Sequence, residues 1–160
     1  PVIMATGMTA VVAGKVGHGV WDYGGHSQQG MRSHMEDTYI LHDEKDYGLY
    51  GVFDGHGGHR TSETARDSFN SHFKASVGSA ASVGEALQVA LDATEAEYAA
   101  RYPGNDGFEG STAVVAAIRE GKVTIANLGD SRCVICRKGR LVLETKDHKP
   151  DDPAEQKRIE

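Results

Sequence analysis

The stretch GVFDGHGG, residues 51–58, decides how the rest of the chain is interpreted. Val52 and Phe53 are typical of a buried strand, and Asp54 follows them at the strand's end. A carboxylate in such a place is costly unless something neutralises it. The glycines around His56 permit a sharp turn and the close approach of a ligand. Because histidine moves protons near neutral pH, the stretch predicts a site for a metal ion and for proton transfer.

Bulk properties restrict the class of protein. The chain has 160 residues, 39% of them hydrophobic and 25% charged, as expected for one soluble globular domain. Its net charge is −6 without a basic block or stripe, so we expect no nucleic-acid partner. Apolar runs are too short for a membrane span, and the first residues lack the pattern of a secretory signal.

The two cysteines, Cys133 and Cys136, form a CxxC pattern that can mark a redox pair or half of a zinc site. Here the pattern lies in a predicted strand, where residues three apart point to opposite faces. No second Cys/His pair with zinc spacing lies nearby. We therefore expect two reduced structural thiols, which suit an intracellular location, cytoplasmic or nuclear.

The order of predicted elements gives the fold class. Apolar residues at four-residue spacing predict a helix over 59–76, and a second helix follows Ser82, whose side chain would form a capping box with Glu85. The other signals are strands, with a hairpin-like turn at 42–48 and tight turns at 120–121 and 138–139. The strands are expected over 9–13, 20–23, 33–42, 47–54, 111–119, 122–128, 132–137 and 141–144, before a helix-like tail. Strands, two helices and strands again predict an α+β fold with helices packed on an antiparallel sheet.

Asp54 is the first candidate metal ligand. Its carboxylate and the carbonyl of Gly55 offer oxygens to a hard cation, although an aspartate before a helix can also be an N-cap. Glu36 and Asp37 are adjacent in the strand predicted over 33–42 and so point to opposite faces. Alone they would read as surface charge, but beside Asp54 one of them becomes a metal partner. An oxygen-rich set favours magnesium or manganese over zinc.

Three further residues have a functional and an ordinary interpretation. Arg32, four residues before Glu36, suits a phosphate dianion, although a lone arginine is usually a surface residue. His56 can protonate a leaving group or can simply be a loop histidine. Asp130 follows a glycine at the end of a strand, as in the Asp54 motif, but GDS is also a common turn.

Four spaced motifs together resemble the metal-dependent protein serine/threonine phosphatases of type 2C, and the tail is similar to the family segment that follows. The match begins near residue 24 and runs to the last residue. It divides the chain into an N-terminal extension with a first strand, 1–23, and part of a catalytic domain, 24–160. The motifs are RSHMED (32–37), VFDGHGG (52–58), GSTAVVA (110–116) and ANLGDSR (126–132), with TKDHKPDDPAEQKRI (145–159) as the tail.

The resemblance implies a sandwich of two antiparallel sheets between layers of helices. It also implies hydrolysis of phosphoserine and phosphothreonine by a water held between two manganese or magnesium ions. Asp54 would bridge the ions and the Gly55 carbonyl would bind one of them, with Glu36 acting largely through water and Asp37 in support. The remaining roles would be phosphate binding for Arg32, general acid for His56 and a place near an optional third ion for Asp130.

The family's catalytic domain continues beyond the motifs present here, and the continuation carries two further aspartates that complete the ligands of one ion. The sequence therefore indicates an incomplete domain with weak or absent turnover on phosphoprotein substrates. The alternative is an inactive module that binds metal or a protein partner. In both cases open sheet edges would favour a homodimer.

Overall fold

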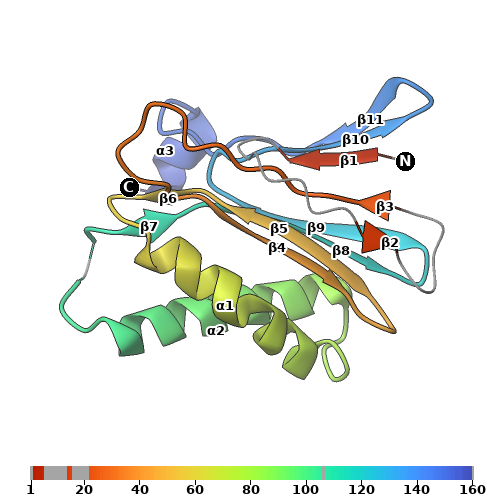
Figure 1. Ribbon diagram of the computed structural model, residues 1–160, viewed down its shortest axis with the longest axis horizontal. Helices are drawn as coiled ribbons and strands as arrows, with labels where there is room; N and C mark the ends of the chain where they lie inside the picture. The colour runs from red at the N-terminus through yellow and green to blue at the C-terminus, as the bar shows by residue number, and fades with distance from the viewer. Residues whose placement is uncertain (1, 6–13, 16–21, 106, 160) are drawn as a thin grey trace.

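The computed structural model describes residues 2–5, 14–15, 22–105 and 107–159 (Figure 1). Antiparallel strands come first, followed by two helices, further strands and a last helix, which is the order expected for an α+β fold. The strands are β1 (Val2–Ala5), β2 (Gly14–Lys15), β3 (Asp22–Tyr23), β4 (Thr38–Asp43), β5 (Gly48–Phe53), β6 (Gly55–His56), β7 (Gly110–Ser111), β8 (Ala113–Arg119), β9 (Lys122–Leu128), β10 (Cys133–Arg137) and β11 (Arg140–Glu144). The helices are α1 (Arg60–Ser76), α2 (Val83–Arg101) and α3 (Pro153–Ile159).

A four-stranded antiparallel sheet, in the order β4-β5-β8-β9, forms the centre of the molecule. The register pairs Thr38 with Phe53 at one end of the β4–β5 hairpin. At the other end the Glu44 N–H donates to the Tyr47 carbonyl at 2.9 Å, which closes the predicted turn. The continuous apolar run of β8 is buried on both faces, as a central strand requires.

Helices α1 and α2 cover one face of this sheet (Figure 1). Phe69 and Phe73, at the predicted spacing on α1, are fully buried against the sheet and α2. At the start of α2 the Ser82 hydroxyl accepts from the Glu85 N–H at 3.0 Å, and the Glu85 carboxylate accepts from the Ala81 N–H at 2.6 Å. The predicted N-cap is confirmed.

A second sheet, in the order β1-β10-β11, lies on the other side of the central sheet (Figure 1). The residues buried between the two sheets form a small cluster of Val52, Val114 and Cys133. The predicted class is confirmed: α+β, as part of an α-β-β-α sandwich. None of the described helices has the length and apolar character needed to cross a membrane.

The strand predicted over 33–42 was wrong in its first half. Strand β4 begins at Thr38, whose partner Phe53 is the last residue of β5, so residues 33–37 have no strand to pair with. Glu36 and Asp37 therefore do not lie on opposite faces of a strand. Arg32 likewise does not share a strand face with Glu36. The run predicted over 111–119 is likewise interrupted at Thr112, which separates β7 from β8.

The remaining local predictions depend on turns and thiols. Glu120 and Lys138 have positive φ, as do the glycines after them, which is the geometry of tight hairpin turns. Both cysteines are free, as predicted, and Cys133 is buried. The strand signals over 9–13 and at residues 20 and 21 lie outside the described residues, and only Asp22–Tyr23 of the predicted 20–23 strand is described.

Substitution of a core phenylalanine tests the helix–sheet packing. Phe73 is fully buried and its ring meets that of Tyr47 edge-on at 5.0 Å, so Phe73→Ala should lower the free energy of unfolding by about 3–5 kcal/mol. Phe108→Ala is the matched control because Phe108 is 77% exposed and should change stability by less than about 0.5 kcal/mol. Equal denaturation midpoints for the two variants would contradict the packing described here.

Candidate metal and phosphate site

The backbone of Asp54 is held in place by Thr112. The Thr112 N–H donates to the Asp54 carbonyl at 2.9 Å, and the Asp54 N–H donates to the Thr112 hydroxyl at 3.1 Å. The hydroxyl of Ser131 lies 2.6 Å from that of Thr112, and both residues are less than 9% exposed. These bonds fix the backbone where β5 ends, while the Asp54 side chain stays exposed. Asp54 is not an N-cap, because α1 begins only at Arg60.

Asp37 and Asp54 form a pair of carboxylates. Burial raises the pKa of Asp37, and the neighbouring Asp54, to which it is hydrogen-bonded, raises it further, to about 6. Glu36 adds to this rise, whereas the positive charge of Arg32 opposes it. Asp37 is thus close enough to Arg32, Glu36 and Asp54 to be affected by the charge of each, although Asp54 comes from a different segment.

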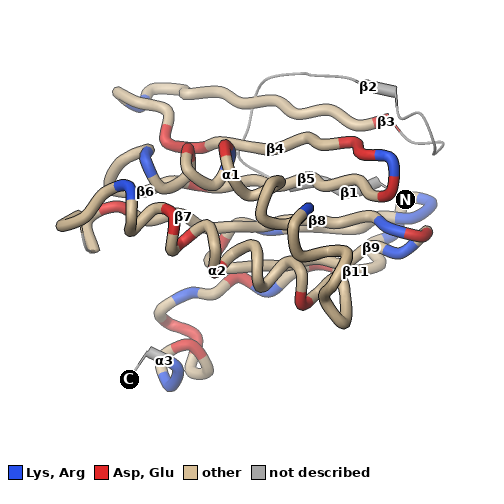
Figure 2. Tube along the Cα trace, turned by 90° about the horizontal axis from the view of Figure 1, so that it is seen from below, with Lys and Arg blue, Asp and Glu red and all other residues tan. Residues whose placement is uncertain are grey.

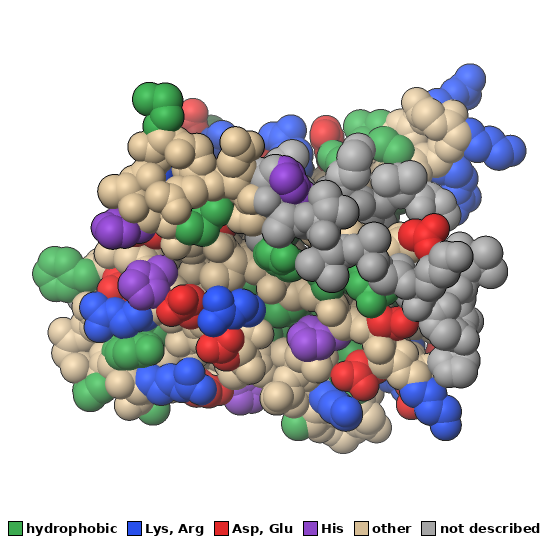
Figure 3. All heavy atoms as spheres, in the orientation of Figure 1, with side chains coloured by type: hydrophobic (Ala, Val, Ile, Leu, Met, Phe, Trp, Pro, Cys, Tyr) green, Lys and Arg blue, Asp and Glu red, His purple; other side chains and the backbone are tan. Residues whose placement is uncertain are grey.

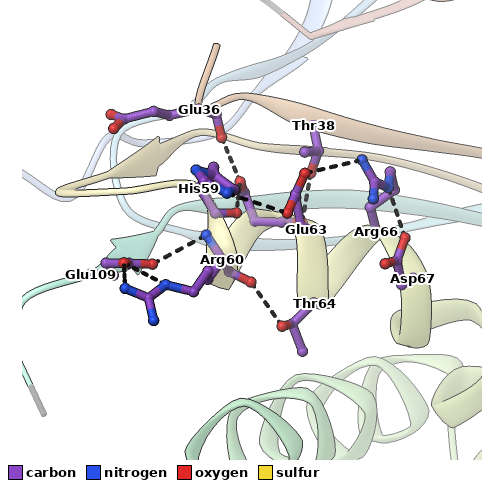
Figure 4. A network of polar contacts seen from close by, with 10 residues as sticks. Glu36, Thr38, His59, Arg60, Glu63, Thr64, Arg66, Asp67 and Glu109 are labelled. Carbon is purple, nitrogen blue, oxygen red and sulfur yellow. Dashed lines mark hydrogen bonds and ion pairs between the residues drawn. The ribbon is translucent and has the colours of Figure 1, made fainter. Parts of the chain in front are cut away.

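The segment with Glu36 and Asp37 is attached to the first turn of α1. Ser62, which is fully buried, donates its hydroxyl proton to the Glu36 carbonyl, and the Thr38 hydroxyl donates to the Ser62 carbonyl at 2.6 Å (Figure 4). Gly55 lies directly beneath this backbone, since a Cβ there would collide with the Glu36 carbonyl oxygen. The hydrogen bonds of Ser62 thus replace the strand pairing that residues 33–37 lack.

The two glycines after His56 make room for the chain itself. A Cβ at Gly57 would collide with the Phe108 carbonyl oxygen, and one at Gly58 with the Glu109 carboxylate. Both glycines also have φ in the range that other residues rarely adopt, +72° and +150°. The close approach that the sequence assigned to a ligand is made here by residues 108 and 109.

The other candidate residues, His56, Arg32 and Asp130, are all exposed. His56 is exposed on β6, and its ring lies so close to Gly110 that a Cβ there would collide with it. Arg32 is exposed, and its carbonyl accepts from the Gln29 amide at 2.7 Å. Asp130 is exposed, and the structure connects it to Asp54 only through its neighbour Ser131 and Thr112. Figure 3 shows charged and histidine side chains gathered where β6, β7 and the start of α1 meet, and Figure 2 marks acidic and basic positions along the same part of the Cα trace.

The donors fit a hard divalent cation in kind but not in number. Two neighbouring carboxylates gain from a cation placed between them, and carboxylate oxygens are the ligands that magnesium and manganese prefer. Within the described residues, however, no group of three or more His, Cys, Asp or Glu is arranged to hold a metal ion. The Asp37–Asp54 pair therefore offers two carboxylates, fewer than a complete metal site needs.

Sequence reasoning assigned no role to Thr112, Ser62 or Glu109, which fix the positions of the candidate residues. Their partners lie 26 to 58 residues away along the chain, so no local pattern reveals them. A weak signal for Thr112 exists in the GSTAVVA motif, where a hydroxyl immediately precedes a buried β-branched strand.

Comparisons with known proteins agree on one family. The family model for protein phosphatase 2C matches residues 21–160. The chain is 36% identical over 147 residues to probable protein phosphatase 2C 59 of Arabidopsis thaliana, which covers 89% of this chain and 47% of that protein. It is 34% identical over 160 residues to probable protein phosphatase 2C 59 of Oryza sativa subsp. japonica, and that match covers 98% of this chain and 49% of the rice protein. The chain spans about half the length of these relatives.

Solved structures share the fold. A sex-determining protein of C. elegans superposes with a TM-score of 0.70 at 28% identity, covering 81% of this chain and 35% of that one. The serine-threonine phosphatase 2C of Toxoplasma gondii gives a TM-score of 0.72 at 23% identity, covering 99% and 58%. The second likeness is of fold alone.

The carboxylate pair makes stability depend on pH. Folding raises the pKa of Asp37 from 3.8 to about 6. The neutral form of Asp37 therefore contributes to the free energy of unfolding in full below pH 4, and this contribution is lost as pH rises through 6. Asp37→Asn keeps the group neutral at every pH. Allowing for solvent screening, we expect the variant to melt about 2–4 °C higher than the native chain at pH 7.5 without metal.

At pH 4 the two melting temperatures should coincide, because Asp37 is then largely protonated. Asp67→Asn, which changes an exposed aspartate of α1 away from the pair, is the control and should not show this dependence on pH. A melting temperature of Asp37→Asn below that of the native chain at pH 7.5 would contradict the repulsion between Asp37 and Asp54.

Proposed function

Because the chain belongs to the protein phosphatase 2C family, we propose that it contributes part of a metal-dependent active site that hydrolyses phosphoserine and phosphothreonine in proteins. The observation that carries the proposal is the meeting of Arg32, Glu36, Asp37 and Asp54, with the raised pKa of Asp37 as its electrostatic mark. An electropositive group beside a pair of carboxylates suits a phosphate and the cations that accompany it.

The proposed roles follow from the position of each group. Asp54, the Gly55 carbonyl, Glu36 and Asp37 hold manganese or magnesium, with Asp130 near an optional third ion. Such ions supply a water that is ionised near neutral pH and positive charge for the phosphoryl oxygens.

Two residues act on the substrate itself in this scheme. The Arg32 guanidinium binds the phosphate oxygens. The exposed His56 imidazole gives a ring proton to the serine or threonine oxygen as it leaves phosphorus.

The site is proposed to be incomplete in these 160 residues. Two observations support this: within the described residues no three acidic or histidine side chains are arranged to hold a metal ion, and the relatives are about twice as long as this chain. We also propose the division into 1–23 and 24–160, and an intracellular location, which the free Cys133 and Cys136 favour.

Calorimetric titration with manganese tests the metal site directly. The native chain should release or absorb heat on binding, and Asp54→Asn should weaken the affinity by about tenfold or more, because it removes one carboxylate charge from the pair. Asp67→Asn is the control and should bind as the native chain does. The absence of a binding heat in the native chain would remove the metal site from the proposal.

Hydrolysis of a phosphothreonine peptide with manganese tests whether the site is complete. We expect weak or no turnover. Robust turnover that is lost in Asp54→Asn would support the phosphatase assignment and contradict the claim that the site is incomplete.

A second candidate function is that of a binding module that associates with itself. The observation in its favour is strand β11, an edge strand of the β1-β10-β11 sheet on which Leu141, Val142 and Leu143 are 43–57% exposed. Exposed apolar side chains on an unpaired edge favour pairing with a second copy.

Light scattering over a range of concentrations tests this association. The average mass should exceed the 17.1 kDa of one chain and fall toward it in Val142→Lys, because a charge on an edge strand opposes edge pairing. The control is Val89→Lys on α2, where the valine is 45% exposed. A native chain that stays monomeric at high concentration would exclude the homodimer.

A further inference from the structure

The first turn of α1 has an unusual cap. His59, the residue at the N-cap position, makes no capping hydrogen bond with its side chain. The Glu109 carboxylate, 49 residues beyond Arg60, takes the place of that side chain. Its Oε2 accepts from the Arg60 backbone N–H at 3.1 Å, and its Oε1 accepts from the Arg60 Nε at 2.8 Å and lies 2.8 Å from a terminal guanidinium nitrogen (Figure 4). The Glu109 side chain is only 7% exposed, whereas Arg60 is 44% exposed, so water reaches these charge-assisted bonds mainly from the arginine side.

The segment that contains Glu109 lacks firm packing behind it. Residues 109–113 line one wall of a cavity of about 610 Å³. The opposite walls come from α1, α2 and the central sheet, with Phe53, Leu91 and Tyr98 among the lining side chains. Side chains that face a cavity lose the contacts that a filled core would supply. The bonds to Arg60 therefore restrain this segment near the cavity, in addition to the β6–β7 pairing and the hydrogen bonds between Thr112 and Asp54.

The front of the same segment touches the candidate site. Phe108 and Glu109 occupy the space left by Gly57 and Gly58, and the backbone of Gly110 lies against the His56 ring. Strand β7 pairs with β6 so that Gly110 is opposite His56. Any shift of the 108–110 backbone would therefore move the turn that carries His56.

We propose that Glu109 is a positioning residue for the candidate site. Its bonds to Arg60 hold residues 108–112 against the 54–58 turn, and this contact sets the place of the His56 imidazole and of the Asp54 carboxylate. Glu109 itself touches neither a metal ligand's oxygen nor the substrate. The functional meaning of the positions of His56 and Asp54 rests on the function proposed above.

A capping role alone would give a different result, and Glu85 provides the comparison. The Glu85 carboxylate accepts from the Ala81 N–H at the start of α2, so it also satisfies a helix terminus, but no interaction of Glu85 involves the 54–58 turn. Glu109→Ala and Glu85→Ala thus both remove an acidic cap, while only the first should disturb the candidate site. Arg60→Lys keeps the backbone N–H and the positive charge but loses the forked guanidinium pairing and its place over the Tyr102 ring, so it serves as a milder variant.

Amide hydrogen exchange without metal measures the positioning directly. We expect exchange over residues 54–60 to accelerate by about tenfold in Glu109→Ala and by less in Glu109→Gln and Arg60→Lys. In Glu85→Ala it should stay within about twofold of the native rate. Unchanged exchange over 54–60 in Glu109→Ala would overturn the proposal whether or not the chain binds metal.

Manganese titration of the same variants links the position to the site. Glu109→Ala should weaken the affinity by about tenfold, whereas Glu85→Ala should bind manganese as the native chain does, even where its melting temperature is equally lowered. Faster exchange with unchanged affinity would also overturn the proposal, because Glu109 would then only cap α1. If the native chain binds no manganese, the metal site fails, and the exchange experiment alone decides whether Glu109 positions the turn.

Discussion

The exchange of hydrogen bonds between Asp54 and Thr112 is the constraint on which the candidate site depends. Strands β5 and β8 are neighbours in the central sheet, and both change direction where these two residues face each other. The buried Thr112 hydroxyl therefore accepts from the Asp54 N–H in place of a backbone carbonyl of the neighbouring strand. The Ser131 hydroxyl, from a third segment, lies within hydrogen-bond distance of the Thr112 hydroxyl. Because buried polar groups must be paired, loss of any one member would leave the others unsatisfied beside the site.

The fold was largely predictable because its signals are local. The spacing of Phe69 and Phe73, the cap at Ser82 and the positive-φ turn at Lys138 each need only a few neighbouring residues. Prediction failed at residues 33–37, where the strand signal is present but the partner is not, since β5 ends at Phe53. Pairing is a property of two segments, so composition alone cannot give the end of a strand.

The candidate site divides in the same way. The chemical groups were visible in the sequence because Asp54, His56 and Asp37 stand in short motifs of unusual composition. The groups that place them were not, because Ser62 and Glu109 look like ordinary helix and loop residues and act across long separations. The role of the glycines changed for the same reason, since residues 108 and 109 occupy the space that the sequence alone assigned to a ligand.

The start of α1 brings these separate observations together. Ser62 holds the segment with Glu36 and Asp37, while the Arg60 backbone and guanidinium hold Glu109 and the segment that lies against the 54–58 turn. Two residues of the first helical turn, Arg60 and Ser62, thus fix two segments that carry or flank the carboxylates. Without a cation, the Asp37–Asp54 repulsion acts against these bonds, as the raised pKa of Asp37 indicates. A cation would remove that repulsion, so its binding should strengthen the same helix start that positions its ligands.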